Sequence, residues 1–296
     1  MRILLVTNTS NHHKYWAYEL YKKYNVVGVC NPNSKPNRKI LKRDLIKNGF
    51  IFQILKLLSS IYHKFSKKSF SKKLKNNQET FFSEASELYK KIPQSIIYSV
   101  ESINSKESID IAKKLNLDII CFLGGDIVKK DFLSLAKIIT LNFHSGVSPF
   151  YNGSGTTFSA VVDNRPNFCG GTLMSMNERI DGGDILAHYL TPIEEKDDSS
   201  RLFLKGIIGA VKLYSIVLDY IIQTNIAPSG YKQERSFRYF TSSDWTIYQD
   251  IKLEVFEKSG KMKRYVRDEK IFTYFDKKKP SNFPLYFESL NEILKK

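Results

Sequence analysis

Short apolar runs alternate with amphipathic segments over the first thirty residues. Residues 2–7 and 25–30 are rich in Val, Ile and Leu and lie between polar turns, which predicts two buried strands. Residues 12–23 place Trp16 and Leu20 on one side and lysines on the other, which predicts an amphipathic helix. A β-α-β unit of this kind implies a parallel sheet with a right-handed crossover.

The same alternation returns in the middle of the chain. Residues 105–115 predict a helix, residues 117–124 a strongly apolar strand, residues 129–137 a short helix and residues 138–144 another strand. We therefore expect an α/β fold, with a Rossmann-like, mostly parallel sheet and helices on both faces.

Residues 34–92 interrupt this rhythm and predict a helical insertion between the second and third strands. A helix over 37–49 ends at Asn48-Gly49, a common C-terminal stop. A second helix, over 50–65, carries an apolar stripe at helical spacing: Ile51, Ile54, Leu55, Leu58, Ile61, Tyr62 and Phe65. We expect this stripe to pack on the domain or on a second subunit.

The formal charge of the chain is +16, and most of it comes from one segment. Between residues 35 and 75 there are thirteen Lys or Arg and one acid, so this segment alone carries +12. Three explanations stay open: phosphate recognition, docking on an anionic membrane or a partner, or a solvated face around a packed apolar stripe. The lysines at 64–75 are expected to remain outside.

The C-terminal third has a different pattern, and we predict a division into residues 1–195 and 196–296. The second part is expected to begin with a helix over 200–223. A small β-rich subdomain follows, on the evidence of the alternation in 251–258 and the apolar run at 270–275. The fold class is thus completed by a small α+β C-terminal extension.

Other features exclude several classes of protein. The most membrane-like segment, 202–222, is interrupted by Lys205, Lys212 and Asp219, which favours a core helix over a membrane span. The opening residues, MRILLVTNTS, predict a strand rather than a signal peptide. The three cysteines are far apart and give neither a disulfide framework nor a metal-site spacing, so we expect a cytoplasmic protein.

Polar residues stand at the end of the predicted strand 138–144. In open α/β sheets, ligands bind at the carboxyl ends of the strands. Asn142 and His144 are two residues apart, so they share a face of that strand. An amide donor is thereby placed beside an imidazole. Downstream, a turn with Asp181 precedes a further strand, and an Asp beside a His fixes its tautomer and stabilises its cation. Asp184 is assigned to capping of this turn.

The remaining histidines are given no catalytic role. His12 and His13 follow the first strand at a helix start, where anion binding is the alternative to the surface or capping role that we expect. His188 lies in an alternating strand and is expected to be a packed or exposed bystander. His63 lies in the basic insertion.

Three motifs together resemble the formyltransferases that use 10-formyltetrahydrofolate: Asn142-Phe143-His144, a loop with Ser148-Pro149 and Gly153, and RIDGGDIL with Asp181. The resemblance covers residues 1–195 and is strongest at 117–195. The family often has His-Pro-Ser after the Asn, whereas this chain reads His144-Ser145-Gly146, so the path of the loop is its own.

The resemblance implies transfer of a formyl group from 10-formyltetrahydrofolate to a primary amine, without a metal. Asn142 would stabilise the developing oxyanion, His144 would stabilise that charge or carry the proton, and Asp181 would hold His144 in place. The folate pterin would lie against two main-chain segments, formed by Gly125, Asp126, Ile127 and Val128 and by Arg179, Ile180 and Asp181.

A closer resemblance concerns the acceptor. The segments LNFHSGVSPFYNGSGTT and VESINSKESI and the basic insertion look like sugar N-formyltransferases of surface-polysaccharide (lipopolysaccharide, O-antigen or capsule) biosynthesis. This implies a nucleotide-linked amino sugar as substrate and no nucleic acid. Separately, we expect a homo-oligomer (a dimer) and, from the charge of the segment, peripheral contact with an anionic membrane or a partner through 35–75.

Besides other small amines as acceptors, two alternatives are kept. Methionyl-tRNA formyltransferase carries a C-terminal β-barrel and a HPSLLPKYRGAAP-like loop, and the tail after residue 225 is too short and irregular for that barrel. The other is a catalytically idle binding module on the same fold.

Overall fold

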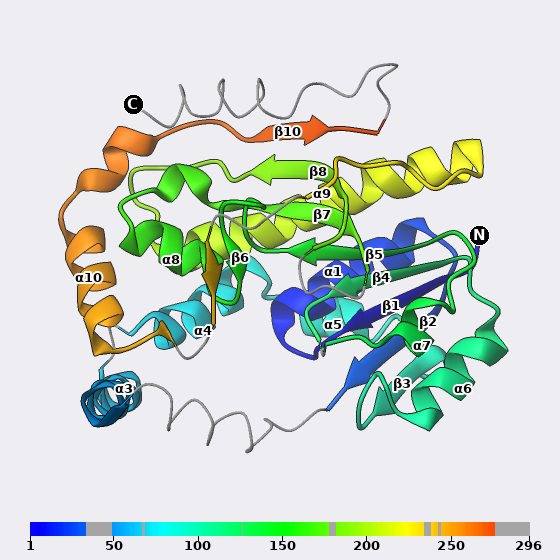
Figure 1. Ribbon diagram of the computed structural model, residues 1–296, viewed down its shortest axis with the longest axis horizontal. Coiled ribbons are helices and arrows are strands. Elements are labelled where there is room, and N and C mark those ends of the chain that lie inside the picture. The colour runs from blue at the N-terminus through cyan, green and yellow to red at the C-terminus, as the bar shows by residue number, and fades with distance from the viewer. Residues whose placement is uncertain are drawn as a thin grey trace.

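A computed structural model describes residues 1–33, 49–66, 69–125, 127–177, 182–233, 238–241 and 244–275. Its centre is one eight-stranded sheet (Figure 1) with the order β10-β8-β7-β5-β4-β1-β2-β3. The strands are β1 (Ile3–Thr7), β2 (Val26–Pro32), β3 (Ile97–Val100), β4 (Ile119–Leu123), β5 (Ile139–His144), β7 (Gly170–Ser175), β8 (Ile185–Leu190) and β10 (Lys270–Thr273). The first five run parallel, and β7, β8 and β10 pair antiparallel beside them.

The two faces of the sheet bury different sets of side chains, because neighbouring residues of a strand point to opposite sides. Leu5 faces a core shared with the helices α1 (Asn11–Lys23) and α9 (Ser199–Thr224), where Trp16 meets Tyr214 edge to face at 5.3 Å between ring centroids. Leu4 and Val6 face the opposite core, under α6 (Lys106–Leu115) and α7 (Lys130–Leu133).

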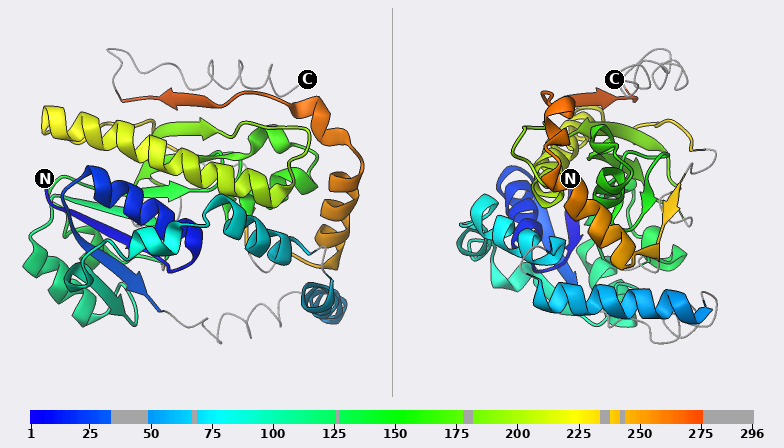
Figure 2. Two further views of the ribbon diagram at one scale, coloured as in Figure 1. Left: turned by 180° about the vertical axis from the view of Figure 1, so that it is seen from behind. Right: turned by 90° about the vertical axis from the view of Figure 1, so that its left-hand side faces the viewer.

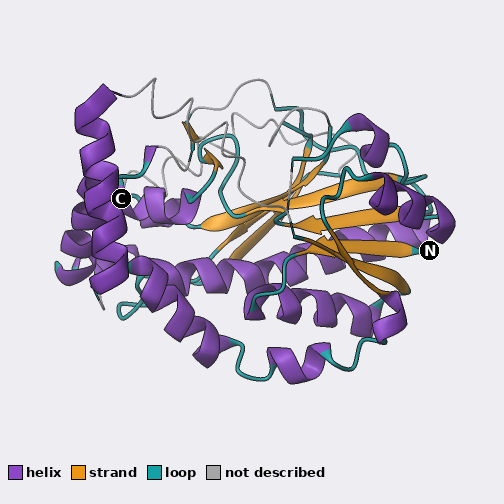
Figure 3. Ribbon diagram, turned by 90° about the horizontal axis from the view of Figure 1, so that it is seen from below, coloured by secondary structure: helices purple, strands orange, loops and turns teal. Residues whose placement is uncertain are grey.

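Helices thus cover both faces of a mostly parallel sheet, as Figures 2 and 3 show. The predicted fold class is confirmed.

The insertion between β2 and β3 is helical where the structure describes it. It contains α3 (Gly49–Phe65), α4 (Phe70–Phe81) and α5 (Ala85–Tyr89), followed by the 3₁₀ turn η1 (Gln94–Ile96). The helix expected over 37–49 falls mostly on 34–48, outside the described residues.

The apolar stripe of α3 is largely exposed in the described part of the chain, so it does not pack on its own domain there, and the expected alternative, packing on a second subunit, stays a prediction. Six large apolar side chains of α3 are at least 44% exposed: Phe50, Ile51, Leu57, Leu58, Ile61 and Phe65. The face of α3 that packs on α10 (Ile247–Lys258) is instead polar. Ser59 donates to Asp250, and Tyr62 donates to Glu254 at 2.8 Å.

The lysines of this region are also partly engaged. Lys73 forms an ion pair with Glu257 of α10 at 2.5 Å and is about a quarter exposed, so the expectation that all lysines at 64–75 remain outside is wrong for this residue.

The predicted β-rich C-terminal subdomain is wrong within the described residues. The segment 251–258 is part of helix α10 because Thr246 and Gln249 form a capping box that starts the helix. Leu253 and Phe256, three residues apart, are buried. The 3₁₀ turn η4 (Lys261–Tyr265) then leads into β10, which joins the central sheet beside β8 rather than forming a sheet of its own.

Four short elements complete the description. The strand β6 (Asn152–Gly153) pairs in parallel with β9 (Tyr239–Phe240), and α8 (Thr156–Val162) and the 3₁₀ turn η2 (Pro166–Phe168) lie between β6 and β7. In the part of the chain that the structure describes, no helix is both long enough and apolar enough to cross a membrane.

Candidate active site

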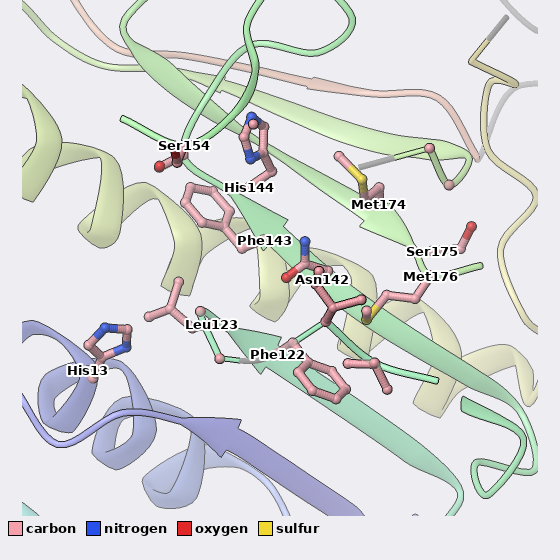
Figure 4. A pocket seen from close by; sticks show the side chains of 18 of the residues that line it. His13, Phe122, Leu123, Asn142, Phe143, His144, Ser154, Met174, Ser175 and Met176 are labelled. Carbon is pink, nitrogen blue, oxygen red and sulfur yellow. The ribbon is translucent and has the colours of Figure 1, made fainter. Parts of the chain in front are cut away.

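A cavity of about 420 Å³ lies at the edge of the sheet where β4 and β5 end (Figure 4). Its floor is formed by the ends of these strands, from Phe122 to Gly125 and from Asn142 to Ser145. On one side lie the ends of β7 and the turn before β8, with Met174–Asn177, Gly182 and Gly183. On the other side lie His12 and His13 of α1 and Phe203 and Ile207 of α9.

Asn142 and His144 come from β5 and both line this cavity, as predicted from their spacing. Asn142 lies between Phe122 of β4 and Met174 of β7 in the sheet. Within the described residues its side-chain amide has no hydrogen-bond partner, so the amide is available to a ligand. His144 is buried, and its Nε2 donates to the backbone oxygen of Tyr151 at 2.8 Å.

The loop after His144 is fixed by its own hydrogen bonds. Ser145 accepts at its carbonyl from the hydroxyls of Thr156 and Thr157, at 2.8 and 3.0 Å. The amide of Ser148 donates to Oγ1 of Thr172 at 2.9 Å, and that hydroxyl donates to the carbonyl of Gly146 at 2.7 Å. The Ser148–Pro149 peptide bond is cis.

Gly146 explains why this chain departs from His-Pro-Ser. A Cβ at this position would overlap the carbonyl oxygen of Tyr151 and lie 2.7 Å from Nε2 of His144. Only a glycine at position 146 therefore allows the carbonyl of Tyr151 to come within hydrogen-bond distance of His144.

His188 supports the same loop from behind. It is fully buried on β8, its Nε2 donates to the carbonyl of Ser148 at 2.9 Å, and its Nδ1 accepts from the hydroxyl of Tyr274 at 2.8 Å. Burial lowers the pKa of His188 to about 4, so the ring is neutral at neutral pH. The expectation of a packed histidine is confirmed, but the residue also holds the loop that follows His144.

The prediction of a surface or capping role for His12 and His13 is wrong. Both are buried and line the cavity, with ring centroids 4.2 Å apart. Burial lowers the pKa of His12 to about 4 and that of His13 to about 3, so neither ring carries a charge at neutral pH. The pairing of β1 with β4 explains their place, because it brings residues following both strands to one edge, and this pairing is seen only in the structure.

The predicted folate-binding residues fall into two groups. Gly125, Ile127 and Val128 line the cavity, and their contact with the folate stays a prediction. Asp126, Arg179, Ile180 and Asp181 lie outside the described residues, so the place of Asp181 beside His144 stays a prediction. Its neighbours Asn177, Gly182 and Gly183 do line the cavity.

Residues 60–215, 156 of the 296 in the chain, match the family model described as Formyl transferase. The chain belongs to this formyl transferase family.

Curated relatives share this part of the formyl transferase chain. The bifunctional polymyxin resistance protein ArnA of Wigglesworthia glossinidia brevipalpis is 31% identical over 183 residues, which are 62% of this chain and 26% of ArnA. A methionyl-tRNA formyltransferase of Clostridium tetani is 28% identical over 134 residues, covering 45% of this chain and 43% of that protein. The match thus spans less than half the length of either relative.

Solved structures of sugar N-formyltransferases share the fold. One from Shewanella sp FDAARGOS_354 superimposes with a TM-score of 0.52 at 14% identity, covering 87% of each chain. WlaRD, a sugar 3N-formyl transferase solved in the presence of dTDP and 5-N-formyl-THF, has a TM-score of 0.50 at 15% identity, covering 87% of this chain and 78% of that one.

Proposed function

We propose that this protein transfers a formyl group from 10-formyltetrahydrofolate to the primary amine of a nucleotide-linked amino sugar. The observation that carries the proposal is the pair Asn142 and His144, side by side on β5 in the floor of one cavity, with the amide unused by the described residues. A hydrogen-bond donor and a proton acceptor next to each other are what acyl transfer to an amine needs.

The roles of the two residues follow from the bonds that change. The amine nitrogen forms a bond to the formyl carbon, and negative charge develops on the formyl oxygen. Asn142 donates from its amide to that oxygen, an effect worth about 2.7–4 kcal/mol for a single donor in comparable sites. The amine then loses a proton, the carrier nitrogen gains one, and the bond between the formyl carbon and the carrier nitrogen breaks.

His144 is the group that can hold the proton. Its Nε2 donates to Tyr151, so in the free protein the proton of the neutral ring stands on Nε2. Asp181, in the turn before Gly182, is the predicted partner of the protonated ring.

The residues around the cavity fit a reduced folate, which supplies the formyl carbon when bound. Gly124 and Gly125 have φ of 71° and 111°, so the chain after β4 turns its peptide groups in a way that other residues rarely adopt. Main-chain donors and acceptors suit a pterin, and the volume of about 420 Å³ is within the range of small-molecule sites. Gly124–Val128 and Asn177–Gly183 are the segments that would hold it. The presence of 5-N-formyl-THF in the WlaRD structure supports this choice of donor.

A sugar acceptor is favoured over charged tRNA by the C-terminal part of the chain. Where the structure describes it after residue 225, this part contains α10, η4 and the short strands β9 and β10, and β10 belongs to the central sheet. These elements do not form the separate β-barrel expected of methionyl-tRNA formyltransferases. The likeness to sugar N-formyltransferases over most of the chain supports the same acceptor.

The test is a formyl-transfer assay with mass spectrometry of the products. The purified protein is incubated with 10-formyltetrahydrofolate and, separately, dTDP-linked 3-amino- and 4-amino-6-deoxyhexoses, UDP-linked amino sugars and charged initiator tRNA. We expect a gain of one formyl group on an amino sugar. Formylation of the tRNA alone rejects the sugar acceptor, and no transfer to any amine supports the idle binding module.

A further inference from the structure

The cavity contains a second polar group that the proposed chemistry does not use. His13 lies at the start of α1, and its Nδ1 is 2.7 Å from Oγ1 of Thr7, the last residue of β1. The same hydroxyl donates to the carbonyl of Leu123, the last residue of β4, at 3.0 Å. A chain of two hydrogen bonds therefore connects the ring to the ends of two parallel strands.

This chain fixes the position of the proton on the ring. A carbonyl oxygen only accepts, so the single hydroxyl proton of Thr7 goes to Leu123. Oγ1 of Thr7 must then accept from Nδ1 of His13, which carries the ring proton. The ring is neutral because burial and the adjacent His12 lower its pKa to about 3. Nε2 of His13 is consequently a bare hydrogen-bond acceptor.

The bare nitrogen lies on the cavity side of the ring. His13 lines the cavity together with Gly124, and a Cβ at Gly124 would lie 3.0 Å from Cε1 and 3.7 Å from Nε2. Among the described residues no donor to this nitrogen is found, and the Leu123 carbonyl, which also interacts with the ring, can only accept. An acceptor of this kind is satisfied only by water or by a ligand.

The order of the strands shows which ligand this is. The Met174–Asn177 segment follows β7, on one side of β5, whereas β4 and β1 lie on the other side, where His13 follows. Figure 4 accordingly shows His13 and Met176 on opposite sides of Asn142. The segment at Met174–Asn177 leads into one of the two segments assigned to the folate, across Asn142 from His13. The other folate segment begins at Gly124, beside His13, so this ring stands where the folate half of the cavity meets the half left for the acceptor substrate.

We propose that Nε2 of His13 accepts a hydrogen bond from an O–H or N–H group on the sugar ring of the acceptor substrate, and thereby orients its amine toward Asn142 and His144. This inference rests on the proposed function and adds a specificity residue to it. In this tautomer Nε2 is an acceptor and does not donate to a phosphate oxygen.

The kinetic test uses two substitutions at His13 and one at Thr7 in the full-length protein, with the amino sugar that the wild type formylates. His13→Phe keeps a ring but removes the acceptor, and we expect the KM for the amino sugar to rise at least tenfold. His13→Gln retains an acceptor and should recover part of this loss. Thr7→Val removes the hydroxyl that holds the ring proton on Nδ1 of His13. It should therefore also raise the KM for the amino sugar. The increase in melting temperature caused by 5-formyltetrahydrofolate should stay as in the wild type in all three variants.

Nitrogen-15 NMR of the histidine rings provides a readout that a merely structural residue does not affect. In the free wild type, we expect the His13 signals of a protonated Nδ1 and a bare Nε2. Addition of the dTDP-linked amino sugar without folate should shift the Nε2 signal toward that of a hydrogen-bonded nitrogen, and addition of dTDP alone should not.

The outcomes separate this inference from the proposed function. Absence of transfer to any amine overturns the proposed function. An active wild type whose KM is unchanged in His13→Phe overturns the role of His13 alone. A proton on Nε2 in the free protein, or an Nε2 shift with dTDP alone, also overturns it.

Discussion

The carbonyl oxygen of Tyr151 accepts a hydrogen bond from Nε2 of His144, seven residues earlier, at 2.8 Å. This contact closes the loop that follows β5 and fixes the proton of the neutral ring on Nε2 of His144. The close approach depends on Gly146, since a side chain there would occupy the space between the two groups.

Replacement of Gly146 by Ala should therefore separate Tyr151 from His144. We expect kcat to fall at least tenfold and the melting temperature to fall as well, because the new Cβ overlaps a backbone oxygen. Activity assays and thermal unfolding measure the two effects. Gly206→Ala in α9 is the matched control, because its Cβ would meet its nearest neighbour at 3.5 Å and Ala favours a helix. An active Gly146→Ala variant contradicts the role given to this contact.

Asn142 and His144 should affect turnover without affecting donor binding. Asn142→Ala is expected to lower kcat by roughly 10²–10³, the usual loss for one oxyanion donor. His144→Asn should lower kcat by about 10²–10⁴, the usual contribution of a positioned acid or base. Steady-state kinetics and the folate-induced rise in melting temperature are measured for both. Near-normal turnover of either variant removes that residue from the mechanism.

The buried histidines should make the protein sensitive to acid. The pKa of His188 is about 4 in the folded protein and about 6.5 when unfolded. Between these values only the unfolded chain binds the proton, so stability rises with pH across the window and is lost on acidification. At about 1.4 kcal/mol per pKa unit, His188 accounts for a loss of about 3 kcal/mol by pH 4.

His188→Gln tests this assignment, since an amide can donate to Ser148 and accept from Tyr274 without titrating. Denaturant unfolding at several pH values should give a flatter profile for His188→Gln than for the wild type, with kcat largely retained. His188→Phe should lose kcat because the loop loses its support. Equal pH profiles for His188→Gln and the wild type contradict the assignment.

The attachment of α3 should depend on one buried carboxylate. Asp250 accepts from Ser59 at 2.5 Å and from Trp245 at 2.8 Å, and His63 lies 3.0 Å away. Asp250→Ala leaves these groups unpaired and should cost about 3 kcal/mol of stability. Glu87→Ala, which removes an exposed ion pair with Lys90, should cost less than about 1 kcal/mol. Thermal unfolding and protease sensitivity of α3 compare them, and similar losses would show that Asp250 has no special role.

The basic insertion is expected to act as a docking surface and not in substrate binding. Lys64 and Lys75 are exposed and belong to this segment, whereas Lys73 is paired with Glu257. Changing Lys64 and Lys75 to Gln should leave the KM for the nucleotide sugar unchanged. Binding to anionic phospholipid vesicles should weaken by about 1 kcal/mol per lysine and decrease with salt. A large rise in KM would instead assign the charge to phosphate recognition.

The sequence alone was sufficient for the parallel half of the fold and for the centre of the site. The strands around β1 and β4 are short apolar runs, and a period of two places Asn142 and His144 on one face whatever surrounds them. These predictions depend only on local geometry. The prediction of a β-rich tail also depended on local geometry, and it was wrong. It relied on the alternation in 251–258 and overlooked the capping box that Thr246 and Gln249 form at the start of α10.

The roles of His12, His13 and His188 required the tertiary structure. Each ring is defined by contacts with residues distant in sequence or on another element, such as Leu123 for the Thr7–His13 pair and Tyr274 for His188. Burial, tautomer and pKa depend on those contacts and leave no periodic trace in the chain. The sequence by itself determined which side chains stand on one strand, and the packing of separate elements decided which histidines reach the cavity and in which protonation state.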